Sequence, residues 1–383
     1  MIKVLLTDTL FRKSFDLFNI LNRYKNKYKI LICSSNKNIF TYLINIIIYW
    51  KVPYQLRTDN YNNFQKDLNG ILKSNTYNEI VYIPIEEMTT LLFYEFIQNN
   101  SYSNLKYKLP PRPSYNITHD KYLLMKFCEK EKFPHPVTYD SEKVDTLNLN
   151  ISQIIIKPRV GSGSENIKHI KTQEDLKILN NINLEQVIVQ EKIGGGQEVI
   201  GAFYLFDREN LISSYCHQRI RTFPESGGVT VYSKLIKNDE VILLGEKLLR
   251  LLNWDGMAMV EFLFDPDDKK YKVIEINPRL WGSILLSEFS NINIIENYIE
   301  LSLNQQPKNY QKKVNSAIRW LFPFEIINLI KNKFYVEGFW KFDLANTCYI
   351  GFTYSNKLRS ILFIILSSFR FEQIIKNLKK IIR

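Results

Sequence analysis

The sequence has few cysteines and no long apolar run. Its four cysteines, Cys33, Cys128, Cys216 and Cys348, lie far apart and form no CxxC pair. This spacing argues against a disulfide-stabilised scaffold and predicts reduced, buried thiols in a cytoplasmic protein. No stretch reaches the roughly 18 uninterrupted apolar residues of a membrane span, and the N-terminus lacks the basic and apolar regions of a signal peptide.

Several catalytic and nucleotide-binding motifs are also missing. The chain has no GxSxG, no GxxxxGK(S/T) and no cysteine–histidine spacing typical of a zinc site. The first predicted strand is followed by Thr7-Asp8-Thr9-Leu10 and not by GxGxxG, so no dinucleotide site is expected at this turn.

The composition is that of a folded protein with an excess of positive charge. Hydrophobic residues make up 45% and aromatic residues 14% of the 383 residues, enough for a sizeable core and two or three domains. The formal net charge is +12, and residues 308–383 hold 14 Lys or Arg against 4 Asp or Glu. Two interpretations of this basic end stay open: a solvated charged face, and a surface that binds a polyanion.

The first 108 residues alternate between strand and helix patterns. Compact apolar runs at Lys3–Thr7, Lys29–Cys33 and Glu79–Ile83 predict buried parallel strands. Helical patterns at Phe11–Tyr24 and Phe40–Trp50 lie between them. This order predicts a βαβ arrangement.

A proline-rich segment ends this first domain. Proline cannot continue a helix or a central strand, so Pro110-Pro111-Arg112-Pro113 marks a boundary. A helix is predicted from Thr118 to Lys132, with Asp120 or Thr118 as its N-cap.

The pattern of residues 150–202 predicts a small lid with a phosphate-binding loop. Its first strand ends at Lys157, and Pro158 and the loop Gly161-Ser162-Gly163-Ser164 follow. A lysine at a strand end is either an edge residue that reaches solvent or a phosphate ligand. The loop favours the phosphate ligand, because glycines let backbone N–H groups approach phosphate oxygens. The rest of the lid is predicted as a helix near 173–181, a strand at 187–191 and a return strand at 198–205.

A predicted hairpin brings two carboxylate side chains and one amide side chain close together. Residues 257–264 and 271–277 have strand patterns, with a turn between them. Strand alternation puts Glu275, Asn277 and Arg279 on one face, and the hairpin brings Glu261 within reach. Mg²⁺ is usually held by one or two carboxylates and by phosphate oxygens, so this set predicts a magnesium site. The alternative is the polar outer face of an ordinary antiparallel hairpin.

A third cluster begins at His217. Arg219 and Arg221 share a face if residues 213–221 form a strand, and the loop Pro224-x-x-Gly-Gly follows. A bidentate arginine suits a carboxylate or a phosphate. His217 is either a general base or a structural strand histidine.

In this order and spacing, these segments resemble the ATP-grasp superfamily, in its carboxylate–amine ligase (carbamoyl-phosphate-synthase-like) branch. The resemblance covers residues 1 to about 300 and implies a fold of α/β and α+β class. It implies an N-terminal Rossmann-like (pre-ATP-grasp) domain at 1–113 and an ATP-grasp domain at 114–305, with its lid at about 150–202. Residues 306–383 are expected to form a basic, helical C-terminal segment.

The resemblance also implies which residue does what. The expected cofactor is ATP with Mg²⁺, or with Mn²⁺ in its place, and the expected metal ligands are Glu261, Glu275 and Asn277. The catalytic groups are Arg279 beside the γ-phosphate, together with Arg219, Arg221 and His217. The expected nucleotide contacts are Lys121, Lys157, Gly161, Ser162, Gly163, Ser164, Glu191, the backbone of Lys192 and Ile193, and Glu198 at the ribose.

The implied reaction joins a small-molecule carboxylate to an amine through an acyl phosphate, with release of ADP and phosphate. Two alternatives stay open: an ATP-grasp enzyme with another nucleophile, as in carbamoyl-phosphate-type chemistry, and a non-catalytic nucleotide-binding protein with a membrane-docking tail. No nucleic-acid partner is expected, because no RNP-like strand interleaves basic and aromatic residues. An oligomer is compatible with the sequence.

The tail has a pattern of its own. Residues 357–383 combine seven basic residues and one acidic residue with apolar residues spaced by three and four, which predicts an amphipathic helix. This helix either packs on the ATP-grasp core or lies on an anionic membrane surface. The second interpretation would place a cytoplasmic protein at the inner face of the membrane.

Overall fold

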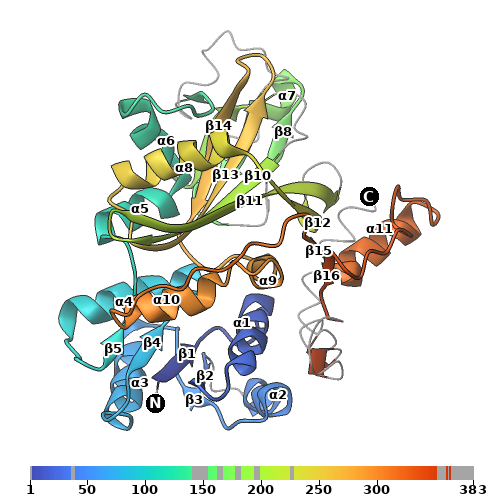
Figure 1. Ribbon diagram of the computed structural model, residues 1–383. Coiled ribbons are helices and arrows are strands. Elements are labelled where there is room, and N and C mark those ends of the chain that lie inside the picture. Colours follow the sequence, from blue (N-terminus) through green and yellow to red (C-terminus); the bar gives the residue numbers. More distant parts are fainter. Residues whose placement is uncertain are drawn as a thin grey trace. The chain divides into compact units, whose positions relative to one another are not determined.

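The structure, a computed structural model, describes residues 2–35, 39–139, 154–161, 167–176, 183–193, 199–224, 228–351, 359–360 and 362–363. The chain divides into two compact units, one of residues 1–108, 279–313 and 348–383, the other of residues 109–278 and 314–347 (Figure 1). The expected fold class is confirmed, since a parallel sheet and antiparallel sheets are both present with helices. The limits of the three domains expected from the sequence stay a prediction.

The first unit is built on a five-stranded parallel sheet in the order β3-β2-β1-β4-β5. The three predicted strands are present as β1 (Ile2–Leu6), β2 (Tyr28–Ser34) and β4 (Ile80–Tyr82). Two-residue strands, β3 (Tyr54–Gln55) and β5 (Leu105–Lys106), form the edges. The central strands are buried almost throughout, which explains their continuous apolar sequences.

Four helices connect these strands: α1 (Arg12–Arg23), α2 (Ile39–Tyr49), α3 (Tyr61–Lys73) and α4 (Glu87–Asn99). The sequence predicted α1 and α2 but did not assign α3 and α4. The βαβ order of a Rossmann-like domain is therefore present in this unit.

Residues 279–313 return to the first unit. They add α9 (Ile284–Phe289) and α10 (Ile294–Ser302). The hydroxyl of Tyr298, on α10, donates to the carbonyl of Tyr82 at 2.9 Å and accepts the N–H of Lys108 at 3.1 Å. A segment distant in sequence thus completes the unit.

The second unit contains a four-stranded antiparallel sheet in the order β6-β9-β7-β8. Its small apolar core contains Ile154, Ile156, Ile170 and Val189. Two of the three strands predicted for the lid are in this sheet, as β7 and β9, whereas the return strand predicted at 198–205 is β10 (Val199–Asp207) of the larger sheet. The elements are β6 (Thr138–Tyr139), β7 (Ile154–Pro158), β8 (Lys168–Ile170), α7 (Gln173–Leu176), the short helical turn η4 (Leu184–Gln186) and β9 (Val187–Glu191).

A larger sheet, in the order β14-β13-β10-β11-β12-β15-β16, also belongs to the second unit, apart from the last residues of β16. The predicted metal-binding hairpin is β13–β14. The strands are β10 (Val199–Asp207), β11 (Asn210–Phe223), β12 (Val229–Ile236), β13 (Gly256–Asp265), β14 (Lys270–Asn277), β15 (Ala317–Arg319) and β16 (Thr347–Tyr349).

Two helices, α6 (Lys121–Lys130) and α8 (Asp239–Leu251), pack on one face of this larger sheet (Figure 1). The core between them takes alternate residues of β10 and β13, including Val260 and Phe262. Successive residues of a strand point to opposite faces, so Glu261 lies on the other face, away from this core.

The helix predicted over 118–132 is in fact two helices, α5 (Arg112–His119) and α6. Asp120 separates them because its extended backbone cannot continue a helix, and its carboxylate accepts the N–H groups of Tyr122 at 2.8 Å and Leu123 at 3.3 Å. The predicted N-cap role of Asp120 is confirmed.

The chain after residue 306 is only partly helical. It contains the turn η5 (Leu321–Glu325) and the helix α11 (Ile326–Lys331), but β15 pairs with β12 and extends the larger sheet. The amphipathic helix predicted at 357–383 lies outside the described residues, apart from 359–360 and 362–363.

Two expectations about the core and the bilayer can be compared with the structure. All four cysteines are buried thiols, as predicted. Within the described ranges, no helix combines the length and the apolar character needed to cross a bilayer.

A close contact between α8 and β10 gives a stability prediction. A Cβ atom on Gly245 would lie 2.1 Å from the hydroxyl oxygen of Tyr204, which is fully buried and donates to two carbonyls of α8, each at 3.1 Å. We expect Gly245→Ala to lower the free energy of unfolding by about 1–3 kcal/mol, because overpacking outweighs the gain in helix propensity. Urea denaturation midpoints measure the change.

Gly70, in α3, is the matched control. Apart from its chain neighbours and the backbone of its own helix, a Cβ atom placed on it would meet no described atom within 4 Å, so Gly70→Ala should raise the free energy of unfolding by about 0.5–1 kcal/mol. A shift of both variants in the same direction would contradict the packing described for Gly245.

Candidate functional site

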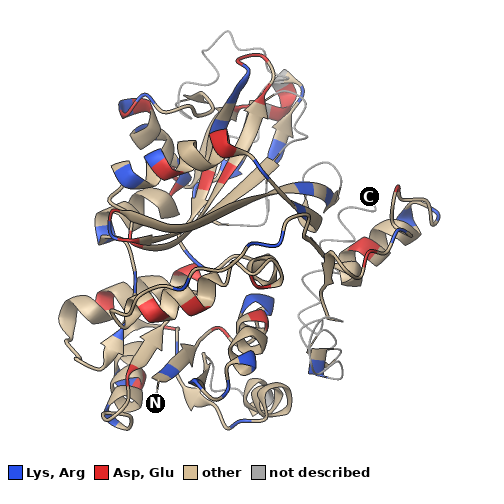
Figure 2. Cartoon of the chain, in the orientation of Figure 1, with Lys and Arg blue, Asp and Glu red and all other residues tan. Residues whose placement is uncertain are grey.

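The hairpin of β13 and β14 places the two predicted metal-binding glutamates opposite each other. Glu261 and Glu275 are direct partners across the strands, and the register shifts after this pair, since Phe262 is next to Val273 and Ile274 of β14 is skipped. Asn277 lies two residues beyond Glu275, and its Nδ2 donates to Glu275 Oε1 at 3.0 Å. Charged residues of both signs lie along these two strands (Figure 2). The three predicted ligands therefore share one face of the sheet.

Lys121, the first residue of α6, reaches this hairpin. Its Nζ lies 3.4 Å from Glu275 Oε2 and donates to the carbonyl of Gly161 at 2.6 Å. Burial alone would raise the pKa of Glu275, but Lys121, the hydrogen bond from Asn277 and Lys157 together hold that pKa below its usual value. Glu275 is therefore ionised near neutral pH.

Arg219, on β11, pairs with the other glutamate. Its guanidinium NH2 donates to Glu261 Oε2 at 2.5 Å, and the Glu261 side chain is only 7% exposed. Burial raises the pKa of Glu261 above its ordinary value, because the attraction of Arg219 does not offset burial and the repulsion of Glu275. A cation between the two carboxylates would relieve that repulsion.

Lys157, at the end of β7, is buried beside the same hairpin. Its Nζ donates to the carbonyl of Ile274, on β14, at 3.5 Å. Burial lowers the pKa of Lys157 to about 8; Glu275 and Glu261 oppose this shift, and Lys121 adds to it. The ammonium is therefore mostly charged at neutral pH but loses its proton more readily than an exposed lysine does.

An ion pair that was not predicted from the sequence fixes the start of α6. Arg159 donates through Nε and NH2 to Asp120 Oδ2 at 3.0 and 2.6 Å. The N–H of Lys121 also donates to the carbonyl of Arg159 at 2.9 Å. These contacts join the end of β7 to α6 and so hold Lys121 and Lys157 on neighbouring elements.

Gly161 begins the predicted phosphate loop. Its φ is 131°, which is readily adopted only by glycine, and among the described residues other than its chain neighbours no atom lies within 4 Å of a Cβ placed there. The predicted contacts Ser162, Gly163, Ser164 and Glu198 lie outside the described residues.

The carboxylate of Glu191, at the end of β9, is bound within the protein. Its Oε1 accepts the N–H of Val137 at 3.0 Å and the Nζ of Lys272 at 2.8 Å. The next two residues differ in exposure, since Lys192 is exposed and Ile193 is buried. Lys272 was not singled out from the sequence, because its partner Glu191 lies 81 residues away along the chain.

The structure separates the two predicted catalytic arginines of β11. A register shift between Arg219 and Arg221 breaks the alternation, so the expectation that they share a face does not hold. Arg221 donates through Nε and NH2 to Glu325 Oε1 at 2.9 and 2.5 Å and lies over the ring of Tyr232. Glu325 is fully buried and also accepts Arg319 Nε at 2.7 Å. Arg221 thus belongs to a buried ion-pair triad and not to the carboxylate hairpin.

His217 is buried next to Arg219 on β11. Within the described residues, neither of its ring nitrogens has a hydrogen-bond partner, and the edge of Phe203 packs against its ring. Burial, with a smaller contribution from Arg219, lowers the pKa of His217 to about 3. A Cβ on Gly201 would lie 2.8 Å from His217 Nε2, so the imidazole fits because the neighbouring strand carries a glycine.

Arg279 belongs to the first unit. It is buried, and its Nε donates to Glu87 Oε1 at 3.0 Å. Its expected place beside a γ-phosphate stays a prediction.

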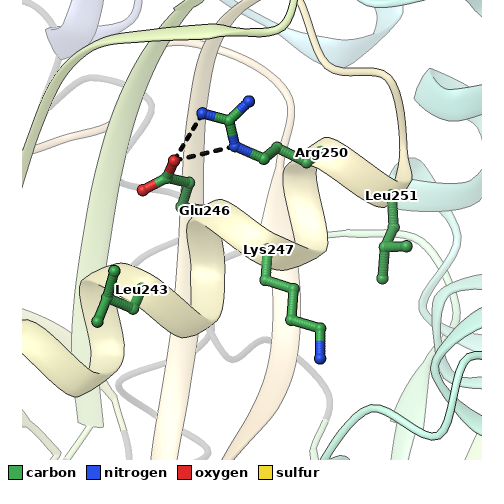
Figure 3. A pocket seen from close by; sticks show the side chains of 5 residues that line it. All are labelled: Leu243, Glu246, Lys247, Arg250 and Leu251. Atoms are coloured by element: carbon green, nitrogen blue, oxygen red, sulfur yellow. Dashed lines mark hydrogen bonds and ion pairs between the residues drawn. The ribbon is translucent and has the colours of Figure 1, made fainter.

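A shallow surface hollow on α8 is a separate feature (Figure 3). Its main polar contact is within the helix, where Arg250 NH2 lies 2.7 Å from Glu246 Oε1. The hollow has no polar groups converging from different elements, so it is the outer side of a surface helix and not a reaction site. Its lining residues are Leu243, Glu246, Lys247, Arg250 and Leu251.

The second unit therefore gathers three cations, Lys121, Lys157 and Arg219, around Glu261 and Glu275. Cations of this kind attract phosphate oxygens, and paired carboxylates suit a hard divalent metal. Among the residues that the structure describes, no group of three or more His, Cys, Asp or Glu side chains could hold a metal by itself. Oxygens of a bound phosphate would have to complete the coordination of such a metal.

Comparison with known proteins agrees with this geometry. A family model described as an ATP-grasp domain matches residues 118–283. A biotin carboxylase from Campylobacter jejuni superposes with a TM-score of 0.63 at 14% identity, over 82% of this chain and 74% of that chain. The biotin carboxylase domain dimer of Hydrogenobacter thermophilus 2-oxoglutarate carboxylase, solved with MgADP, ADP and bicarbonate, gives a TM-score of 0.63 at 13% identity, over 82% and 73%.

A third similar structure is the N5-carboxyaminoimidazole synthetase from Staphylococcus aureus, with a TM-score of 0.60 at 14% identity, over 87% of this chain and 85% of that chain. Identities this low establish a shared fold and no more. A search of curated protein sequences finds no significant match.

The family match and the geometry concern the same part of the chain. Residues 118–283 include both phosphate lysines expected from the sequence and all three expected metal ligands. The superposed structures show that the similarity in fold extends over most of the chain. The chain therefore contains an ATP-grasp domain, matched over residues 118–283.

Proposed function

We propose that this protein is an ATP-dependent ligase that joins a small-molecule carboxylate to an amine and releases ADP and phosphate. The observation that carries the proposal is the convergence of Lys121, Lys157 and Arg219 on the Glu261–Glu275 pair within an ATP-grasp fold. Lysines supply positive charge for phosphates, and the carboxylate pair supplies ligands for a metal.

The residues present fit Mg²⁺, because Glu261, Glu275 and the amide oxygen of Asn277 are hard oxygen donors on one sheet face. Bound there, Mg²⁺ would neutralise phosphate charge during phosphoryl transfer. Lys121 and Lys157 would bind phosphate oxygens beside it. Arg219 would hold Glu261 in place and stabilise negative charge on the reacting group.

The proposed chemistry has two steps. A carboxylate oxygen of the acid attacks the γ-phosphorus, the bond between the β- and γ-phosphates breaks, and ADP leaves. The amine nitrogen then attacks the acyl carbon, the carbon–oxygen bond to phosphate breaks, and the nitrogen gives up a proton. His217 is poorly suited to accept that proton, because its pKa is about 3, whereas the departing phosphate is a stronger base.

A second candidate reaction uses bicarbonate as the acid. The similar structures include biotin carboxylases and an N5-carboxyaminoimidazole synthetase, and one of them was solved with MgADP and bicarbonate. The same cations and carboxylates would support formation of carboxyphosphate, and an amine would then accept the carboxyl group.

Substitution of the metal-binding face tests the site. We expect Glu275→Gln combined with Asn277→Ala to reduce ADP formation by roughly 100-fold or more, because a preorganised charge-stabilising contact is lost. ADP release at saturating ATP and Mg²⁺ measures this effect, and circular dichroism checks the fold. Glu240→Gln, an exposed carboxylate in the first turn of α8, is the matched control and should leave turnover unchanged. Near-normal turnover in the double variant would place the metal elsewhere.

The position and the pKa of Lys157 predict how its substitution and the pH change the affinity for ATP. Lys157→Ala should weaken binding of a non-hydrolysable ATP analogue by roughly 10- to 150-fold, since a charge-assisted contact contributes roughly 1.5–3 kcal/mol. The ammonium binds phosphate only when protonated, and its pKa in the free protein is about 8. Affinity should therefore fall as pH rises through 8, by up to about tenfold per pH unit.

Calorimetric titrations between pH 7 and pH 9.5 check this dependence. Lys157→Arg should bind the analogue with little change over that range, because an arginine stays charged. A wild-type affinity that is constant over the range would show that Lys157 does not contact phosphate.

The reaction itself is tested by trapping the intermediate. ADP release is first screened over amino acids, small carboxylates, amino sugars and bicarbonate. With the active acid, ATP and hydroxylamine, we expect a hydroxamate, because hydroxylamine attacks an acyl phosphate. Activity that requires bicarbonate and yields no hydroxamate would favour the second candidate. Absence of ADP release with every acid and amine would leave a nucleotide-binding protein without ligase activity.

A further inference from the structure

One lysine of the larger sheet is surrounded by three carboxylates. Lys272 lies on β14, and its side chain is only 9% exposed. Its Nζ lies 2.8 Å from Glu191 Oε1, 2.7 Å from Asp265 Oδ2 and 2.9 Å from Asp268 Oδ2. A buried ammonium is costly unless it is paired, so this arrangement is a built network and not a chance surface contact.

The turn of the hairpin fixes Lys272 from one side. Asp265 is buried and accepts the N–H of Asp267 at 3.0 Å, so its carboxylate has little freedom. Burial opposes the charge of Lys272, but hydrogen bonds to Asp265, Glu191 and Asp268 raise its pKa well above the usual value. The ammonium therefore stays charged throughout the physiological pH range.

The other side of Lys272 holds the end of β9. Glu191 Oε1 accepts both Lys272 Nζ and the N–H of Val137, while the N–H of Glu191 donates to the carbonyl of Val137 at 2.9 Å. The carboxylate is thus bound at the strand end and is not left to approach a ligand. Lys192 and Ile193 follow immediately, so their backbone is the next part of the chain that this anchor positions.

Lys272 also joins the two sheets of the second unit. Glu191 is in the four-stranded sheet and Lys272 in the larger one. A second link runs in the opposite direction, since Lys157 of the four-stranded sheet donates to Ile274 of β14. The phosphate lysine and the strand end at 191–193 are therefore both attached to the strand that carries Glu275.

We propose that Lys272 is a positioning residue for nucleotide-base recognition: it holds the Glu191 carboxylate against Val137, so that the backbone of Lys192 and Ile193 binds the adenine of ATP. This inference rests on the proposed function, because it requires ATP as the nucleotide. It changes the role expected for Glu191, which acts through its attachment to Lys272 and not as a direct ligand of the base.

The experiment compares two ligands that differ in the base. Isothermal titration is carried out with a non-hydrolysable ATP analogue and with inorganic tripolyphosphate, both in Mg²⁺, on the full-length protein. We expect Lys272→Met to weaken binding of the analogue roughly tenfold, as when a contact supporting a binding site is lost, and to leave tripolyphosphate unchanged. Equal weakening of both ligands would overturn the inference, because it would show general disruption of the site.

Lys270→Met is the matched control. Lys270 lies on the same strand and is exposed, so this variant removes the same charge without touching Glu191. It should bind both ligands as the wild type does. An equal loss of analogue binding in Lys270→Met would attribute the effect to net charge and reject the positioning role.

A second pair of variants tests whether Lys272 acts through Glu191. Glu191→Gln in the Lys272→Met background should recover most of the analogue affinity, because it removes the carboxylate left uncompensated. No recovery would mean that Lys272 acts on the hairpin turn alone and would overturn the inference. If Lys272→Met does not fold, Glu191→Ala carries the test, with the same selective loss of analogue binding expected and equal loss of both ligands counting against it.

The control with wild-type protein separates the two proposals. Wild type that binds tripolyphosphate but not the ATP analogue would refute the proposed function. Wild type that binds both, together with a Lys272→Met variant that also binds both normally, would refute only the role of Lys272.

Discussion

The candidate site depends on mutual neutralisation of charges buried on one face of the larger sheet. An unpaired buried ion is unfavourable by several kcal/mol, so neither carboxylate of the hairpin could stay ionised alone. Glu261 is compensated by Arg219, and Glu275 by Lys121 and Lys157. These cations come from β11, α6 and β7, so the site exists only when all of these elements are in place. The charge balance that permits chemistry is also what holds the elements together.

One face of the larger sheet packs in the core, and the other carries the charged side chains of the candidate site. Val260 and Phe262 enter the core beneath α6 and α8, whereas Glu261 between them faces the cations. This division follows from the period of two in a strand. Register shifts change this regular alternation. One follows Glu261, and another lies in β11, where it turns Arg221 to the face opposite Arg219, so that Arg221 pairs with the buried Glu325. A single inserted residue thus decides which of two arginines belongs to the site.

Residues with a local sequence signal could be predicted, and those defined by distant partners could not. Lys157 before a glycine loop and Glu275 two residues before an asparagine are recognisable within a few positions, as are the continuous apolar runs of β1, β2 and β4. Arg159 and Lys272 look like ordinary surface cations, because Asp120 and Glu191, the carboxylates that tie them to other elements, lie 39 and 81 residues away along the chain. The two-residue edge strands and the register shifts leave no pattern that propensity or periodicity could detect.

The first unit is assembled from separated stretches of chain. The hydroxyl of Tyr298 on α10 bonds to Lys108 across 190 positions, so the edge of the parallel sheet is completed only by a late segment. During synthesis on the ribosome, residues 1–108 are made before α10, and so are strands β10 to β14 of the larger sheet, which carry Arg219, Glu261 and Glu275. The parallel sheet therefore lacks its contacts with α10 until that helix has been made. This sequence must therefore fold in an order that is compatible with the direction of translation, in addition to forming its final contacts.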